Sequence, residues 1–301
     1  MKFVGMCLDS LAKMDFDDYE VILIDNGSVD GSREMIEEKY PWVRMIKLPS
    51  NMGFATACNK GIKASKGRYI CLLNNDIEVE PDWLKKLYEG MERHPEYGMG
   101  TTKMMFLHDR EAFYNTGDLF HAWCAGGGRG QGEKDLGQYD NEEPVFGACA
   151  GAGIYRRELF ESVGVFDEDF FIFAEDVDLN MRSQLQGFKA IYLPEAKVYH
   201  IGTATVGLYS DRYVFLCKRN DVLVLIKNMS LKMYFKYLKS ILQHQLEDIR
   251  YFSYRGQGAV LLKSKLSALR MLPVMLWRRF KIQRSRTVSD SEIEKLVITD
   301  L

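Results

Sequence analysis

The sequence predicts an α/β protein whose mostly parallel sheet is flanked by helices and followed by a helical appendage. Within the first 80 residues, short apolar runs that end in Asn or Asp alternate with segments of helical periodicity. Such runs are typical of strands buried on both faces, and their alternation with helices favours crossover connections. Residues 227–286 hold fourteen Lys or Arg against Glu247 and Asp248. We therefore expect two parts, residues 1–226 and 227–301.

The composition is that of a globular protein of 301 residues, because its hydrophobic fraction of 47% suffices for a large core. No apolar run reaches the roughly 20 residues of a membrane span, and no signal peptide opens the chain. Six cysteines lack the CxxC spacing of zinc sites and are expected to be reduced thiols: Cys7, Cys58, Cys71, Cys124, Cys149 and Cys217. The expected compartment is the cytoplasm.

The chain is expected to open with a helix over residues 1–14, followed by a short strand that ends at Asp25. In the polar turn after this strand, Ser28 or Asp30 is a suitable cap for a helix over residues 33–39. Acids at a strand end fit a ligand site, but a capped helix start explains the same residues without a ligand.

A second unit combines a strand over residues 41–48 with a helix over residues 54–65. The helix is entered through Asn51 and Gly53 and is rich in small residues. Small residues let a helix pack closely on a sheet, or let a ligand approach the helix N-terminus.

The strand over residues 68–73 stops abruptly at Asn74, Asn75 and Asp76. Open α/β sheets bind ligands beyond the carboxyl ends of their strands. A carboxylate there can hold a hard divalent cation, which in turn can bind a diphosphate. An Asn-rich turn without a ligand is the alternative explanation.

The Gly-rich segment 125–143 is either an acceptor-binding lid or idle surface. Acids at positions 175, 176 and 178 fall in a first helical turn, where the macrodipole alone favours them, and this is the preferred explanation for Asp178. The further elements expected up to residue 228 are a helix over 83–91, strands over 99–107 and 147–155, helices over 156–163 and 175–186, a strand over 197–199 and a helix over 213–228.

Three motifs follow one another in the order IDNGSVDGS, NMGFATACNKGI and GRYICLLNNDIEVEPDWL. In this order they resemble family 2 glycosyltransferases of the GT-A fold, particularly the rhamnosyltransferase-like members. The resemblance implies that Asp25 and Asp30 bind the nucleotide of a nucleotide-diphosphate sugar. Asn51 and Gly53, in the second motif, are expected to contribute to donor binding.

The same resemblance places a DXD-type motif at Asn74, Asn75 and Asp76, which would contact the donor and bind Mg²⁺ or Mn²⁺ through Asp76. Asn74 stands where a strict DXD motif has an acid. A lone His is usually structural. In this family, however, a His after the last strand completes the metal site, and the resemblance assigns that role to His200.

The segment with Glu175 and Asp176 resembles the ED motif of the family, in which the Asp is the general base of inverting enzymes. Glu175 and Gly151, the latter in the small-residue strand over 147–155, are expected to contact the acceptor. Arg219 lies in a helix that resembles the terminal segment of the family and is expected to approach the diphosphate. Inversion needs one base for the acceptor hydroxyl and no second carboxylate as nucleophile.

One feature departs from the family pattern at the start of the chain. Members normally begin with a strand that cradles the base, followed by a helix with a CLxSL-like pattern. This chain has CLDSL at residues 7–11 and starts just before it. We therefore expect the first strand to be missing, donor binding to be weakened, and the neighbouring strand to pair with a second copy, giving a homodimer.

The appendage carries two apolar stripes with basic residues and Trp277 beside them. Basic amphipathic helices with an interfacial aromatic residue suit an anionic membrane surface, such as the inner face of the cell membrane. The alternative is that these helices pack on the catalytic part. Nucleic acid is not expected as a partner because no recognition motif accompanies the charge. The stripes consist of Met233, Tyr234, Tyr237, Leu238, Ile241 and Leu242, and of Leu261, Leu262, Leu266, Leu269 and Leu272.

The leading hypothesis is therefore an inverting, metal-dependent glycosyltransferase of surface polysaccharide synthesis. It would move a sugar, with rhamnose the best match by likeness, from a nucleotide-diphosphate donor to a glycan or lipid-linked acceptor. Two alternatives remain open, a nucleotidyltransferase and a catalytically inactive nucleotide-sugar-binding protein.

Overall fold

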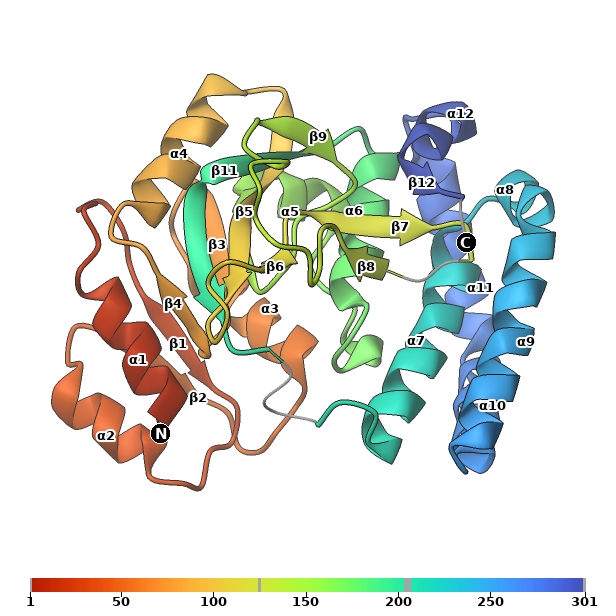
Figure 1. Ribbon diagram of the computed structural model, residues 1–301, viewed down its shortest axis with the longest axis horizontal. Coiled ribbons are helices and arrows are strands. Elements are labelled where there is room, and N and C mark those ends of the chain that lie inside the picture. Colours follow the sequence, from red (N-terminus) through yellow and green to blue (C-terminus); the bar gives the residue numbers. More distant parts are fainter. Residues whose placement is uncertain (1, 124–125, 203–206, 300–301) are drawn as a thin grey trace.

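The computed structural model describes residues 2–123, 126–202 and 207–299, and it confirms the α/β class (Figure 1). A central sheet is flanked by helices, and a further group of helices lies beside it toward the C-terminus. Cys124 and residue 125 of the Gly-rich segment fall outside the described residues, whereas the other five cysteines are free thiols.

The strands are β1 (Ile22–Asp25), β2 (Arg44–Lys47), β3 (Tyr69–Leu73), β4 (Ile77–Val79), β5 (Tyr97–Phe106), β6 (Phe113–Asn115), β7 (Asp118–His121), β8 (Gly126–Gly128), β9 (Glu143–Val145), β10 (Ala152–Arg156), β11 (Lys189–His200) and β12 (Val297–Ile298). The α-helices are α1 (Lys2–Leu11), α2 (Ser32–Lys39), α3 (Phe54–Ala64), α4 (Trp83–Arg93), α5 (Arg157–Val163), α6 (Glu175–Leu185), α7 (Asp211–Asn228), α8 (Leu231–Lys236), α9 (Leu238–Tyr254), α10 (Gly258–Arg270), α11 (Leu272–Ser285) and α12 (Asp290–Ile293). Two short 3₁₀ turns are η1 (Glu168–Phe170) and η2 (Glu294–Leu296).

The central sheet has seven strands in the order β3-β10-β5-β11-β4, with β6 paired to β5 and β9 paired to β11. Its pairing is mixed, which corrects the expected mostly parallel sheet. Strands β5 and β11 run parallel, but β10 runs antiparallel to β3 and β5, and β4 runs antiparallel to β11. An apolar run predicts burial on both faces of a strand but not its direction, so the sequence pattern could not decide this.

Two smaller sheets accompany the central one. The predicted first βα units form the parallel pair β1–β2, and β7 lies between β8 and the C-terminal strand β12. The Gly-rich segment is therefore partly a strand, and Arg129 ties it to β6 and β7 by donating to the carbonyl oxygen of Thr116. A lid function for this segment remains a prediction.

Helices cover both faces of the central sheet. On one face α4 packs against β5 and β11 through Trp83, Leu87 and Met91, which recur every four residues and are almost fully buried. A second cluster joins β3, β10 and β11 to α3, α5 and α6 on the other face. This arrangement fixes the carboxyl end of β3 and the start of α6 on one rigid body.

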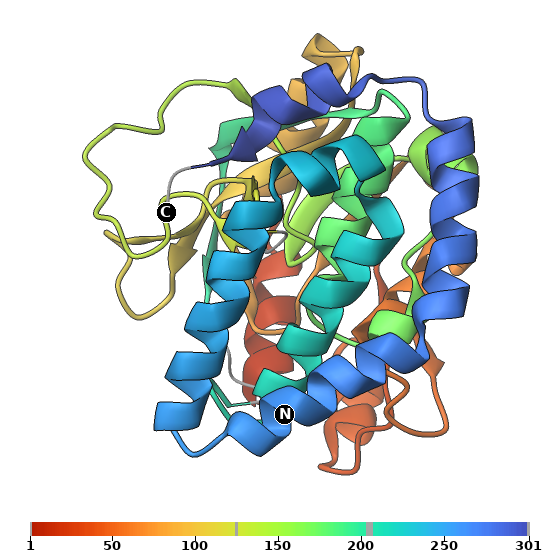
Figure 2. The ribbon, with the colours of Figure 1, turned by 90° about the vertical axis from the view of Figure 1, so that its right-hand side faces the viewer.

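The C-terminal helices pack around α7 (Figure 2), which contacts both α10 and α11. One apolar cluster joins Phe120 and Phe146 to Leu223 of α7, Met233 of α8 and Met275 of α11. The predicted boundary at residue 226 falls inside α7, and a division into two units stays a prediction. Among the described helices, none combines the length and the hydropathy that crossing a bilayer requires.

A buried ion cluster links α6 to α7. Asp178 is fully buried and accepts hydrogen bonds from Arg182 Nε at 2.9 Å, Lys227 Nζ at 2.8 Å and Asn228 Nδ2 at 2.8 Å. Burial acts to raise the pKa of Asp178, but the charges of Lys227 and Arg182 outweigh it and lower the pKa to about 2. Asp178 therefore has a structural role, in addition to its favourable interaction with the helix dipole.

Lys227→Ala should destabilise the protein by about 3–5 kcal/mol, because it leaves Asp178 and Asp167 buried without their shared cation. The free energy of urea unfolding measures the effect. Since the pKa of Asp178 is lowered on folding, its stabilisation is present above the unfolded pKa near 3.8 and is lost as the pH falls toward 2. Lys236→Ala, which removes an exposed ion pair with Glu294, should barely move the unfolding midpoint. Equal effects of the two variants would contradict the assignment.

Candidate active site

Two predicted metal ligands meet at the edge of the central sheet. Asp76 lies in the turn between β3 and β4, and His200 is the last residue of β11, which pairs with β4. The Nε2 atom of His200 lies 3.1 Å from Oδ1 of Asp76, and the two side chains are 7% and 11% exposed. Tertiary pairing thus joins two residues that are 124 positions apart.

The Asp76–His200 pair fits a divalent cation. Neighbouring ligands of an ion bound at 2.0–2.1 Å in octahedral geometry lie about 3 Å apart, which matches the observed separation. The ring of Tyr114 packs edge-on against the ring of His200, with the two ring centres 4.4 Å apart. Burial, assisted by the charge of Asp76, raises the pKa of the nearby Cys7 thiol to about 12, so Cys7 stays protonated and is a poor ligand.

The general-base candidate Asp176 lies in the first turn of α6. It is partly buried, and its Oδ1 accepts the backbone N–H of Val177 at 2.8 Å. Burial raises the pKa of Asp176 above its ordinary value. Glu175 beside it is buried, and burial followed by the charge of Asp176 raises the pKa of Glu175 as well.

Asp118 and Cys149 lie next to Asp176, and neither is among the site residues predicted from the sequence. Their ligand atoms all lie within 4.8 Å of one another. The two carboxylate oxygens of Asp118 accept hydrogen bonds from Asn115 and Asn180 at 3.0 and 2.9 Å. Burial and then the charge of Asp176 raise the pKa of Asp118, while burial and then Asp118 raise the pKa of Cys149.

Tyr114 and Gly151 connect the two halves of the site. Burial first, and then the charges of Cys149, Asp76 and Asp176, raise the pKa of Tyr114, whose ring also packs against His200. Gly151 accepts the backbone N–H of Asn74 at 2.8 Å, and a Cβ added to it would lie 3.5 Å from Sγ of Cys149. The two halves therefore form one candidate active site.

The segment that leads into α6 has a strained backbone. Phe171, Phe173 and Ala174 have φ angles of 65°, 72° and 60°, which residues other than Gly rarely adopt. Asn220 of α7 holds this backbone by donating to three carbonyl oxygens, including those of Ile172 and Phe173 at 3.0 and 2.7 Å. Strain that neighbours hold in place is typical of functional sites, and here it sets the start of α6.

Arg219 is placed on the same segment. Its guanidinium donates to the carbonyl oxygens of Asp169 and Phe170 at 2.9 and 3.0 Å, and its Nε donates to Asn220. These contacts indicate that Arg219 supports the approach to α6, whereas a contact with the diphosphate remains a prediction.

The donor-motif residues connect the first βα unit with this segment. Asn51 accepts from Nδ2 of Asn26 at 3.2 Å and from the backbone of Gly53 at 3.0 Å. Gly53 has a φ of 90°, and a Cβ there would lie 2.6 Å from the carbonyl oxygen of Phe171, so only glycine fits. Asn75, the middle residue of the DXD-type motif, is exposed.

Asp25 and Asp30 make contacts near α2. Asp25 is buried, accepts the backbone N–H of Ser28 at 3.1 Å and pairs with Arg33. Burial acts to raise the pKa of Asp25, but the hydrogen bonds from Ser28 and Arg33 lower it. Neither Ser28 nor Asp30, the two expected caps, is the N-cap of α2. The N-cap is Gly31, whose φ of 82° lets the chain turn there. Asp30 instead accepts the backbone N–H of Ser32 at 3.2 Å.

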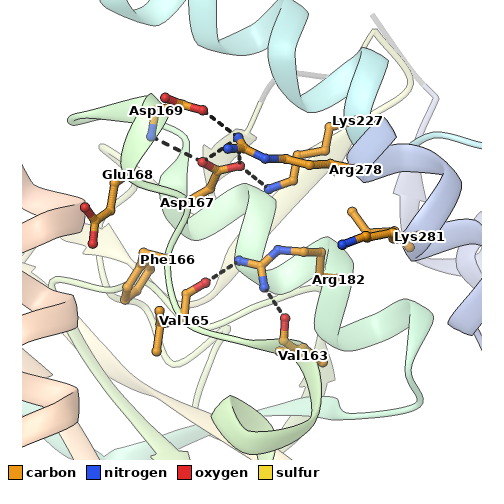
Figure 3. A pocket seen from close by; sticks show the side chains of 11 residues that line it. Val163, Val165, Phe166, Asp167, Glu168, Asp169, Arg182, Lys227, Arg278 and Lys281 are labelled. Atoms are coloured by element: carbon orange, nitrogen blue, oxygen red, sulfur yellow. Dashed lines mark hydrogen bonds and ion pairs between the residues drawn. The ribbon is translucent and has the colours of Figure 1, made fainter. Parts of the chain in front are cut away.

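A pocket of about 430 Å³ lies apart from these residues, between α11 and the segment that leads into η1 (Figure 3). Within it, Asp167 pairs with Arg278 of α11 at 2.7 Å and with Lys227 of α7 at 2.6 Å. Its cations are largely neutralised by its own acids. These ion pairs therefore hold α11 against the segment that precedes α6. No predicted site residue lines the pocket.

Comparisons with known proteins identify the family and the fold. A family model described as Glycosyl transferase family 2 matches residues 2–164. An N-acetylglucosaminyl-diphospho-decaprenol L-rhamnosyltransferase of Mycobacterium tuberculosis is 26% identical over 238 residues, covering 67% of this chain and 75% of the relative.

Solved structures share the fold. S. aureus TarS 1–349 in complex with UDP-GlcNAc superposes with a TM-score of 0.58 at 18% identity, covering 98% of this chain and 88% of TarS. The mannosyltransferase PcManGT of Pyrobaculum calidifontis, in complex with GDP-Man and Mn²⁺, gives 0.55 at 14% identity, covering 89% and 83%. The expected GT-A fold is thereby confirmed. This chain belongs to glycosyl transferase family 2.

Proposed function

We propose that the protein transfers a sugar, with inversion, from a nucleotide-diphosphate donor to a glycan or lipid-linked acceptor. The observation that carries the proposal is the position of Asp176, which lies in the first turn of α6 beside Cys149. Gly151 connects Cys149 to the turn that contains Asp76. Family membership supports glycosyl transfer over the alternative of a nucleotidyltransferase.

Asp76 and His200 would hold Mg²⁺ or Mn²⁺. A cation bound there would supply Lewis-acid neutralisation of the charge that develops on the departing diphosphate. The group formed by Asp118, Cys149 and Asp176 is a weaker candidate for the metal. Its thiol has a raised pKa and both oxygens of Asp118 already accept hydrogen bonds, so a cation would have to displace existing partners.

Asp176 would act as the general base. The acceptor hydroxyl oxygen forms a bond to the anomeric carbon while the bond from that carbon to the diphosphate oxygen breaks, and the hydroxyl proton passes to the carboxylate of Asp176. Retention would require a second carboxylate as nucleophile. Asp118 lies beside Asp176, but it is only 5% exposed and both its oxygens accept hydrogen bonds, which supports inversion.

The substrates are proposed from relatives. The mycobacterial relative is named for transfer of L-rhamnose to an N-acetylglucosaminyl-diphospho-lipid, so we propose dTDP-rhamnose and a polyprenyl-diphosphate-linked sugar for this chain. UDP- and GDP-sugars are the next candidates, since solved neighbours bind UDP-GlcNAc and GDP-Man. These substrates suit a role in surface polysaccharide synthesis.

The test is a transfer assay that offers dTDP-rhamnose, UDP-GlcNAc or GDP-mannose, each with Mn²⁺ and a short prenyl-diphosphate-linked N-acetylglucosamine. We expect mass spectrometry to find an acceptor heavier by one sugar, and NMR to find the anomeric configuration opposite to that of the donor. In a parallel assay with a nucleoside triphosphate and a sugar 1-phosphate, formation of a nucleotide sugar with release of diphosphate would instead indicate a nucleotidyltransferase. Donor binding without turnover for any pair would indicate a binding protein.

A further inference from the structure

An open apolar groove is lined by residues of α8 and α11. Both helices lie on the side of the molecule that Figure 2 turns toward the viewer. The volume of the groove is about 460 Å³. The apolar side chains Leu231, Leu276 and Phe280 are 64%, 46% and 61% exposed. The groove, called here the α8–α11 groove, is lined by Leu231, Leu276, Arg279, Phe280, Gln283 and Arg284.

Further exposed aromatic residues extend this surface. Phe235 lies one helical turn after Leu231 on α8 and is 67% exposed, and Trp277 on α11 is 57% exposed. The Nζ atom of Lys281 stands 3.5 Å from the centre of the Trp277 ring. An amphipathic aromatic ring beside an ammonium group is suited to the boundary between lipid headgroups and acyl chains.

Two arginines line the groove. Arg279 is partly buried: its Nη1 reaches the carbonyl oxygen of Ile226 at 3.4 Å, and its Nη2 is enclosed by the protein. Arg284 is exposed, and its guanidinium carbon lies 5.9 Å from the centre of the Phe280 ring. An exposed guanidinium can form strong charge-assisted hydrogen bonds with phosphate oxygens, so Arg284 is available to an anionic ligand.

We propose that the α8–α11 groove docks on an anionic phospholipid bilayer. Leu231, Leu276 and Phe280 would enter the boundary of the acyl chains, while Arg284 would contact lipid phosphates.

The charge of the region favours a bilayer over a second copy of the chain. Residues 227–286 hold fourteen basic residues against two acids. Within the part of the chain that the structure describes, only four of the fourteen pair with acids outside this segment, namely Lys227, Lys236, Arg278 and Arg286. A symmetric dimer through this face would bring the same patch of each copy together and oppose like charges. An anionic leaflet instead attracts such a segment.

The groove is also tied to the active-site scaffold. Arg278, adjacent to Arg279 on α11, pairs with Asp167 and Asp169 at 2.7 Å, in the segment that precedes α6. Docking through α11 would therefore hold the catalytic part at a fixed orientation to the bilayer. The docking itself does not rest on the proposed transferase activity.

Vesicle sedimentation of the full chain, without any donor, tests the proposal. We expect binding to vesicles with about one third phosphatidylglycerol to be at least tenfold tighter than to phosphatidylcholine alone, and to weaken as salt is added. Phe280→Ser should weaken binding about tenfold, and Arg284→Gln should reduce the preference for anionic vesicles. Leu246→Ser on α9, which removes a similarly exposed apolar side chain, serves as the matched control and should bind normally.

Circular dichroism should find all three variants folded. Equal binding to both vesicle types, or equal losses for Phe280→Ser and Leu246→Ser, would overturn the proposal. So would a wild-type dimer that Phe280→Ser dissociates, since a second copy would then cover the groove. A failure of the transferase assay would leave vesicle binding unchanged, so the two proposals are tested separately.

Discussion

Asp176→Asn is expected to lower kcat by about 10²–10⁴-fold, because an amide cannot accept the acceptor proton in the transition state. Donor affinity should change little, since Asp176 belongs to none of the predicted donor motifs. Steady-state transfer assays and calorimetric titration of the donor measure the two quantities. Asp82→Asn at the N-cap of α4, a similar substitution at a half-exposed acid, is the control and should leave kcat unchanged.

The pH dependence provides a second check on Asp176. Burial raises its pKa, so its carboxylate form is lost at a pH above the ordinary value near 3.8. Transfer should therefore decline as the pH falls through this raised pKa, and the residual activity of Asp176→Asn should lack that decline. A variant that keeps wild-type kcat and the same acidic limb would exclude Asp176 as the base.

Asp76→Ala should abolish the dependence of donor binding on the divalent cation. The affinity for Mn²⁺ should fall by more than about 10–100-fold, the loss that removal of a residue merely supporting a metal ligand produces. Titration calorimetry with Mn²⁺ and donor, with and without EDTA, measures both affinities. Glu78→Gln, two residues along in β4 and engaged with Arg110 on the surface, is the matched control and should behave as wild type.

Two outcomes would contradict the metal assignment. Donor that binds equally well in EDTA and to Asp76→Ala would show that no cation acts at this position. Alternatively, Mn²⁺ affinity that survives Asp76→Ala but is lost in Asp118→Asn would move the metal to the group of Asp118, Cys149 and Asp176.

The sequence indicated the elements well where a local pattern controls them. The apolar run 69–73 and the small-residue helix 54–64 occur as β3 and α3, and the acids at 175 and 176 start α6 as expected. These features depend on residues close together in the chain, so periodicity, turn residues and helix ends suffice to predict them.

Other parts of the candidate site lay beyond local patterns. In the sequence, Asp118 looks like an ordinary polar residue of a turn. Its place in the candidate site depends on Asn180, which is 62 positions away and donates a hydrogen bond that holds it beside Asp176. Cys149 is a reduced thiol, as expected, and is partly buried. Only the fold brings it against two carboxylates. Arg219 offered a cation for the diphosphate, whereas the fold engages it with the backbone of residues 169 and 170.

By itself, the sequence determined the family motifs, the α/β alternation and the basic character of the last helices. Tertiary structure decided the direction of β10, the approach of His200 to Asp76 within 3.1 Å, and which apolar side chains of α8 and α11 stay exposed. The reason is physical: composition and period set what each segment can bury, but strand direction and the meeting of distant side chains depend on how the whole chain minimises its exposed apolar surface at once.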